Sequence, residues 1–149
     1  TWLLYKLTGS LLTEPTNASR TMLMSLHDCS WDEELCALFE IPQSALPQIV
    51  RSDSRFGEVS CNCFSVPVTG IRGDQQASLF GNGCRRADTA KCTFGTGAFL
   101  LLNTGAEIRS SSSGLLTTVA SARDTVQYAL EGSIFVAGSV VQWLRDELG

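Results

Sequence analysis

Four short apolar runs, each bounded by residues that favour turns, constrain the fold of this chain more than any other feature. The breaks between the runs are rich in Gly, Asn, Thr and Ser. Apolar strands separated by short turn-forming breaks favour pairing of successive strands. We therefore expect an antiparallel meander, whose strands cover residues 92–94, 98–102, 115–120 and 126–130.

A helical pattern follows these strands at residues 134–148. Its apolar residues repeat at helical spacing and predict a stripe that packs on a core. The stripe comprises Ile134, Ala137, Val141, Leu144 and Leu148. Gly138, Gln142 and Arg145 fall on a second face of the same helix.

The first half of the chain predicts shorter helices. Residues 2–7 resemble the end of a buried helix closed at Gly9. Ser30 followed by Glu33 three residues later forms a capping-box pattern, with Ser30 as the N-cap. The apolar residues after this cap are predicted to share one helix face, and they are Leu35, Leu38 and Phe39.

The middle of the chain is less regular. Residues 41–54 hold two prolines and several small polar residues, so we expect an ordered loop. Residues 66–71 predict a strand, and residues 75–80 predict a short helix that starts at Asp74.

Bulk composition excludes several function classes. The 149 residues are 44% hydrophobic and carry a net charge of −4, which is typical of a globular domain. The net negative charge argues against nucleic acid as a partner. Apolar runs are too short for a membrane span, and no signal peptide is visible.

The six cysteines leave three readings open, namely disulfides, a metal site or free thiols. Cys61 and Cys63 form a close pair that could bind a metal. The chain has a single histidine, His27, and no second close cysteine pair, which argues against a structural zinc. We expect no metal site among these residues.

Two stretches carry residues suited to chemistry. Residues 73–76 read Gly-Asp-Gln-Gln, and the carboxylate of Asp74 could accept a proton from a hydroxyl. Residues 94–97 read Phe-Gly-Thr-Gly, and glycines beside Thr96 would let backbone N–H groups approach phosphate oxygens. A base for an alcohol beside a phosphate cradle is what phosphoryl transfer to a polyol needs. Each motif alone is also a common turn.

The sequence around these motifs resembles that of the glycerol kinases of the FGGY carbohydrate kinase family. The resemblance spans nearly the whole chain in one order. It is carried by Thr-Asn-Ala-Ser-Arg-Thr-Met-Leu from residue 16, Trp-Asp at 31–32, Gly-Ile-Arg-Gly-Asp-Gln-Gln at 70–76, Leu-Leu-Thr-Thr at 115–118, Tyr-Ala-Leu-Glu-Gly at 128–132 and Gln-Trp-Leu-Arg-Asp at 142–146.

This resemblance implies an α/β fold of the actin-like ATPase (ribonuclease H-like) type, with parts of two domains flanking a cleft. Residues 1–82 would be the C-terminal part of the first domain, and residues 83–149 the N-terminal part of the second. Family members are several times longer, so we expect an interior piece of a larger kinase. The implied activity is ATP-dependent phosphorylation of glycerol to glycerol 3-phosphate in the cytoplasm, by a full-length enzyme that is a homo-oligomer.

The resemblance also implies roles for single residues. Asp74 matches the catalytic base and Gln75 a side chain that hydrogen-bonds the polyol. Phe99 matches an apolar wall against the carbon chain of glycerol. The remaining matches are to nucleotide-binding residues, and they are Gly95, Thr96, Gly97, Gly138 and Gln142.

Several of these residues also have an alternative, purely structural explanation. Asp74 could serve as a helix N-cap, and Phe99 could pack in the core. Gly138 could be a helix contact, with Gln142 solvated. The resemblance implies ATP and Mg²⁺ as cofactors, with the magnesium ligand outside this sequence. Two other functions stay open: a kinase for another polyol or ketose, or a non-catalytic nucleotide-binding paralogue.

Overall fold

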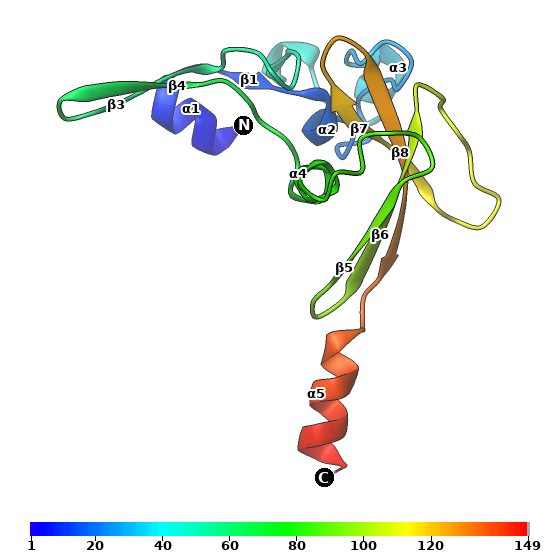
Figure 1. Ribbon diagram of the computed structural model, residues 1–149. Coiled ribbons are helices and arrows are strands. Elements are labelled where there is room, and N and C mark those ends of the chain that lie inside the picture. The colour runs from blue at the N-terminus through cyan, green and yellow to red at the C-terminus, as the bar shows by residue number, and fades with distance from the viewer. Residues whose placement is uncertain (149) are drawn as a thin grey trace. The chain divides into compact units, whose positions relative to one another are not determined.

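The chain divides into two compact units. The computed structural model describes residues 1–148, so Gly149, the last residue of the predicted second domain, lies outside the described residues. The first unit comprises Thr1–Gly73 and Ser121–Val126, and the second comprises Asp74–Ala120 and the chain from Gln127 onward. Both units contain helices and strands (Figure 1), and residues 121–126, where one strand ends and the next begins, group with the first unit.

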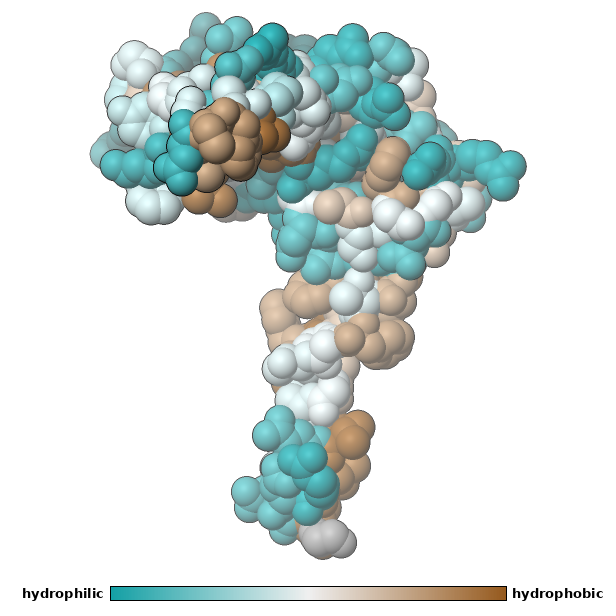
Figure 2. Space-filling model, turned by 60° about the vertical axis from the view of Figure 1, so that its left-hand side comes forward, coloured by the Kyte–Doolittle hydropathy of each residue, from teal (hydrophilic) through white to brown (hydrophobic). Residues whose placement is uncertain are grey.

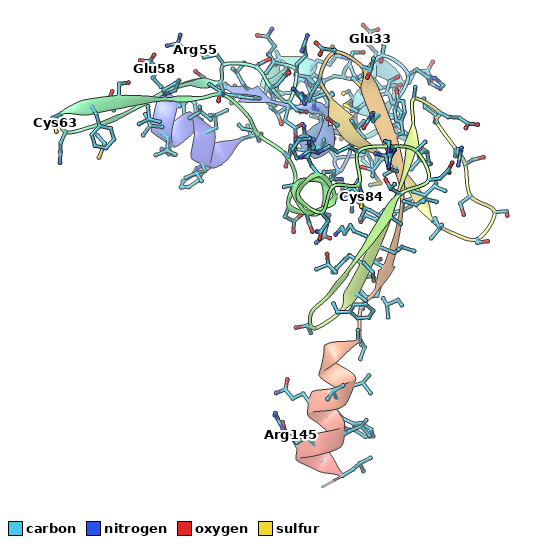
Figure 3. All side chains as sticks on the ribbon, viewed as in Figure 1. Glu33, Arg55, Glu58, Cys63, Cys84 and Arg145 are labelled. Atoms are coloured by element: carbon cyan, nitrogen blue, oxygen red, sulfur yellow. The ribbon has the colours of Figure 1, made fainter. Side chains whose placement is uncertain are left out.

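Short elements build the first unit. In chain order they are α1 (Trp2–Thr8), β1 (Leu12–Thr13), α2 (Pro15–Ala18), α3 (Glu33–Leu38), the 3₁₀ helix η1 (Gln43–Ala45), β2 (Gln48–Ile49), β3 (Gly57–Cys61) and β4 (Phe64–Val68). Strands β1 and β2 pair in parallel, and β3 and β4 form an antiparallel hairpin against which α1 packs. Cys63 lies at the tip of this hairpin (Figure 3).

The predicted loop over residues 41–54 is only partly correct, because η1 and β2 lie within it. The predicted strand over residues 66–71 begins earlier and ends earlier than expected, as β4. Its partner β3 was not predicted, since its sequence, Gly-Glu-Val-Ser-Cys, is too polar to stand out as an apolar run.

The first helix is confirmed, but its predicted burial is wrong. Gly9 closes α1 in the left-handed conformation, as the sequence indicates. Among the described residues, only Leu4 of α1 is buried, whereas Trp2 is 71% exposed. A short helix that packs on one strand pair has just one covered side, so its other apolar residues stay exposed.

The predicted N-cap of α3 is wrong by two residues. Asp32 caps the helix, and its Oδ1 accepts a hydrogen bond from the Leu35 N–H at 2.9 Å. Ser30 instead donates its hydroxyl to Asp28 Oδ2 at 2.9 Å, in the turn before the helix. Cys36 is the buried residue of α3, while Leu38 is 74% exposed, so the predicted apolar face is not the side that α3 buries.

A buried carboxylate organises the centre of the first unit. Glu14 is fully buried and caps α2, where its side chain accepts from the backbone N–H groups of Thr16 and Asn17 at 3.0 and 2.8 Å. It also accepts from the Thr16 hydroxyl at 2.5 Å and from the Ser52 hydroxyl at 2.7 Å. Thr16 Oγ1 in turn accepts from the Gly73 N–H at 2.8 Å. One carboxylate thereby fixes three separated segments of the chain.

We predict that Glu14→Gln destabilises the chain by about 1–3 kcal/mol, because an amide nitrogen would replace one acceptor oxygen among these donors. Urea denaturation followed by circular dichroism measures the change. Glu34→Ala, an exposed change on α3, is the control and should shift stability by less than about 0.5 kcal/mol. Equal stability of the Gln variant and the parent would contradict the central role of this carboxylate.

The second unit is a helix on a sheet, followed by a second helix. Its elements are α4 (Asp74–Gly81), β5 (Ala90–Phe94), β6 (Ala98–Gly105), most of β7 (Leu116–Ala122) and of β8 (Val126–Ile134), and α5 (Gly138–Glu147). The end of β7 and the first residue of β8 group with the first unit. The predicted start of α4 at Asp74 is confirmed. Leu79 of α4 joins a buried cluster with sheet residues, and the cluster comprises Leu79, Cys84, Leu101, Ala120 and Ala129.

The four predicted strands exist, but their order is not a meander. The sheet order is β5-β6-β8-β7, so β8 pairs with β6 and β7 lies at the edge (Figure 1). Both the β5–β6 and β6–β8 pairings are antiparallel. The ten-residue connection between β6 and β7 is long enough to place β7 beyond β8, which sequence-adjacent pairing does not anticipate.

The last helix starts later than predicted, because β8 continues to Ile134 before α5 begins at Gly138. No residue of α5 is buried within the described chain, so the predicted core stripe is wrong. Apolar side chains do gather along one side of α5, as Figure 2 shows. The helical spacing therefore identified an apolar face correctly without identifying what covers it.

All six cysteines are free thiols in the structure. Among the described residues, no helix is both long enough and apolar enough to cross a membrane.

Candidate functional site

The first turn of α4 carries the carboxylate and the amide that the sequence singled out. Asp74 is exposed, and its Oδ1 accepts a hydrogen bond from the Gln75 N–H at 2.8 Å. The Gln75 side chain points back, so that its Nε2 lies 3.4 Å from Asp74 Oδ2. An acceptor and a donor thus stand next to each other at the start of one helix.

A buried lysine on the neighbouring strand holds the amide. Lys91 of β5 is only 7% exposed, and its ammonium donates to Gln75 Oε1. It also donates to the Thr93 hydroxyl at 2.7 Å. Burial lowers the pKa of Lys91 below its ordinary value, and the negative charge of Asp74 acts in the opposite direction.

The strand register places these groups on the same sheet face as Phe99. Thr93 pairs directly with Phe99, and Lys91 pairs directly with Leu101. Directly opposed residues of an antiparallel pair point to one side, and residues two apart on a strand share that side. The half-buried ring of Phe99 therefore lies on the face that carries Lys91 and Thr93.

The second motif forms the turn of the β5–β6 hairpin. Gly95 donates its N–H to Gly97 O at 2.7 Å, which closes the turn. Thr96 is exposed at its tip. The turn predicted between these two strands is therefore confirmed. In the structure it contacts the beginning of α5.

Backbone hydrogen bonds join the turn to α5. The Ala137 and Ser139 N–H groups donate to Thr96 O at 2.8 and 3.3 Å, and the Gly138 N–H donates to Gly95 O at 2.9 Å. The first amides of a helix lack partners within it, and here the carbonyls of the turn supply them. Gly138 and the Gly95–Gly97 turn are thus brought together.

Glycine is required where these two segments meet. A Cβ added to Gly138 would clash with the backbone oxygen of Gly95, and one added to Gly97 would clash with the backbone oxygen of Ile134 at the end of β8, just before α5. Backbone atoms cannot move aside as the end of a flexible side chain can. These glycines have a steric role that does not depend on any ligand.

Gln142 lies one turn beyond Gly138 and is exposed. The Arg145 guanidinium holds the pKa of Asp146 below its usual range, and a hydrogen bond from Gln142 acts in the same direction. Arg145 projects from α5 (Figure 3), and its Nε donates to Asp146 Oδ1 at 2.6 Å. Gln142 therefore lies on the same polar side of α5 as Asp146. The start of this helix contacts Thr96.

Lys91 and Thr93 were not predicted as site residues. The signal was present, because Lys91 and Thr93 alternate with apolar residues in the strand, and a lysine in such a run needs a partner when it is buried. The apolar run predicts a strand that begins at residue 92, which leaves Lys91 outside it, whereas β5 begins at Ala90. Among the described residues, no group of three or more His, Cys, Asp or Glu side chains could hold a metal ion.

Comparison with known proteins identifies the family. A profile of the FGGY family of carbohydrate kinases, N-terminal domain, matches residues 1–81, and one of the C-terminal domain of the same family matches residues 90–149. The chain belongs to the FGGY family of carbohydrate kinases.

Curated FGGY relatives include a glycerol kinase of Shewanella frigidimarina. It is 54% identical over 152 residues, which cover 100% of this chain and 30% of the relative. Glycerol kinase 1 of Clostridium tetani is 50% identical over 99% of this chain and 31% of its own length. The chain therefore spans slightly less than a third of the length of the curated relatives that it matches.

Solved structures confirm the predicted fold class. The Plasmodium falciparum glycerol kinase with ADP superposes with a TM-score of 0.91 at 44% identity, over 97% of this chain and 30% of that protein. A xylulose kinase from Brucella ovis superposes with a TM-score of 0.87 at 24% identity, over 99% of this chain and 32% of that protein, which shows the fold alone. The chain has the actin-like ATPase architecture of FGGY kinases.

We predict that Gly138→Ala destabilises the second unit, because the new methyl group must displace the backbone of Gly95. Overpacking of this kind typically costs about 1–3 kcal/mol. Thermal unfolding of the variant and the parent measures it. Gly81→Ala at the end of α4 is the matched control, since a Cβ there meets no atom within 4 Å. If the two variants have the same melting temperature, the turn and α5 do not make the contact described.

Proposed function

We propose that this chain supplies part of the active site of an ATP-dependent glycerol kinase, which forms glycerol 3-phosphate. The observation that carries the proposal is the exposed carboxylate of Asp74 beside the amide of Gln75, on the sheet face that bears Phe99. The glycerol kinase relatives at 50–54% identity support the same substrate.

In the proposed reaction, Asp74 accepts the proton of a glycerol hydroxyl as the oxygen attacks the terminal phosphorus of ATP. The bond from that phosphorus to the bridging oxygen of ADP breaks, and ADP leaves with the electron pair. Phosphoryl transfer depends mainly on position and charge, so a correctly placed base and acceptor are the protein's contribution here. Asp74 is exposed and can approach a substrate.

Glycerol contacts are assigned to two further residues. Gln75 donates an amide hydrogen to a hydroxyl oxygen, and the ring of Phe99 covers the carbon chain. Half-burial of Phe99 leaves part of its ring accessible for such a contact. A carboxylate, an amide and an aromatic surface together match a small molecule that has hydroxyl groups on a short carbon backbone.

Nucleotide contacts are assigned to the turn and to α5. Thr96, between Gly95 and Gly97, would meet the terminal phosphates, while Gly138 and Gln142 would lie on the adenosine side. Hydrogen bonds between the turn and α5 support a single surface for both. The relative solved with ADP supports a nucleotide ligand.

The remaining expectations extend this proposal. Mg²⁺ accompanies ATP, and we assign it to no residue of this chain, because the described residues hold no suitable cluster. A domain boundary between residues 82 and 83 is supported by the family profiles, which end at residue 81 and resume at residue 90. Free cysteines support a reducing, cytoplasmic location. A homo-oligomeric full-length enzyme stays a prediction.

A hybrid enzyme tests the proposal. In it, this chain replaces the matching segment of the Shewanella frigidimarina glycerol kinase. The residues named here are therefore all present in the hybrid. We expect the hybrid to phosphorylate glycerol in a coupled assay of ADP release. A hybrid that folds, as judged by a cooperative thermal transition, but shows no turnover with glycerol would contradict the proposed function.

In this hybrid, Asp74→Asn should lower kcat by roughly 10²–10⁴-fold, because the amide keeps the shape of the side chain but cannot accept the proton. Nucleotide affinity should stay within about twofold of the parent. Asp88→Asn is the matched control, since Asp88 is an exposed aspartate paired with Arg109 and lies outside the proposed site. An Asp74→Asn enzyme that keeps half of the parent rate would remove Asp74 from the role of base.

A pair of truncations should separate the two ligands. Phe99→Ala should raise the KM for glycerol by about tenfold and leave the KM for ATP nearly unchanged, since a lost apolar contact is worth about 1–3 kcal/mol. Gln142→Ala should do the reverse. Phe64→Ala, which truncates a 58% exposed phenylalanine of β4 outside the proposed site, serves as the control. If Phe99→Ala weakens both ligands equally, the ring belongs to the core instead.

A further inference from the structure

The buried ammonium of Lys91 has no role in the proposed phosphoryl transfer. It lies on β5 under the first turn of α4, where the side-chain oxygens Gln75 Oε1 and Thr93 Oγ1 accept hydrogen bonds from it. A lysine that is only 7% exposed requires partners, because an unpaired charge in the interior is strongly unfavourable. Gln75 supplies one of them, and this fixes what the rest of its amide can do.

The orientation of the Gln75 amide follows from the chemistry of the lysine. An ammonium group only donates hydrogen bonds, so the atom of Gln75 that faces it must be the carbonyl oxygen. The amide nitrogen is then turned the other way, and its position 3.4 Å from Asp74 Oδ2 agrees with this. Without Lys91, the two ends of the amide could exchange places by rotation.

We propose that Lys91 is a positioning residue that fixes Gln75 as a pure hydrogen-bond donor, so that the Asp74–Gln75 pair recognises an alcohol hydroxyl. This inference rests on the proposed function, and it adds how the site distinguishes a hydroxyl from other oxygen-containing groups. A hydroxyl can donate its hydrogen to Asp74 while its oxygen accepts from Gln75 Nε2. A carbonyl oxygen has no hydrogen for Asp74 and leaves that acceptor unmatched.

Charges around Lys91 support this arrangement. Asp74 lies on the α4 side, and Glu131, which is 5% exposed, lies in the same cross-strand row, because Lys91 pairs with Leu101 and Leu101 pairs with Glu131. The negative charge of each raises the pKa of Lys91 against the effect of burial. These carboxylates therefore favour the charged ammonium, which is the form that can only donate to Gln75.

The first test needs no substrate. In ¹⁵N spectra of the full chain, Lys91→Met should move the side-chain amide signals of Gln75, because their carbonyl loses its donor. Lys6→Met, which changes the exposed lysine of α1, should not move them. Unchanged Gln75 amide signals in the Lys91→Met variant would overturn the positioning role, whatever the hybrid enzyme does with glycerol.

The second test measures affinity in the hybrid enzyme by calorimetry. Lys91→Met should weaken glycerol binding by about tenfold, with the ADP affinity within about twofold of the parent. Thr93→Val keeps the charge but removes one acceptor of the ammonium, and it should weaken glycerol binding by a smaller factor. This second variant keeps the test decisive if Lys91→Met does not fold.

A double-mutant cycle identifies the route of the effect. In a Gln75→Ala background, Lys91→Met should weaken glycerol binding no further, because its effect passes through the amide. Additive effects of the two changes, or an equal loss of ADP affinity, would overturn the inference. A parent hybrid that binds no glycerol would contradict the proposed function itself, and the Gln75 signals would still decide the role of Lys91.

Discussion

The register of β5 against β6 is the constraint on which the candidate site depends. Pairing Lys91 with Leu101 and Thr93 with Phe99 puts all four side chains on one face of the sheet. A slip of one residue would turn this set to the opposite face, because side chains alternate along a strand. The lysine would then lose Gln75, and the phenylalanine would leave the face proposed for glycerol. Short closure at Gly95–Gly97 fixes this register.

A second constraint acts within the first unit, at its residue Gly73. The Gly73 N–H is bound by Thr16, whose hydroxyl is in turn bound by the buried carboxylate of Glu14. The network therefore holds the last residue of the first unit's main segment, Gly73, in place within that unit. The motif at residues 16–23 carries the family resemblance, and this network gives part of it a structural reason.

Sequence reasoning identified local structure better than its surroundings. It predicted α4, the strands and the glycine turn, because these follow from apolar periodicity and from residues that break it. It gave the wrong order for β7 and β8, since pairing across a long connection leaves no local trace. The capping motif misled in the case of Ser30, because Asp32 offers an equally good acceptor two residues closer to the helix. Burial was predicted least well. Val141 is exposed in the described chain, whereas Lys91 is buried, although lysine side chains are mostly found on protein surfaces. Periodicity shows which residues share a side, whereas burial depends on what else packs there.

The close backbone contact between Gly138 and Gly95 has a consequence for comparing homologues. Because Gly138 and Gly97 are demanded by sterics alone, purifying selection on the fold would keep them even in a paralogue that had lost catalysis. Their retention therefore carries no information about activity. Asp74 is exposed and subject to no such packing demand, so under the proposed function its loss in a homologue would mark a decayed active site.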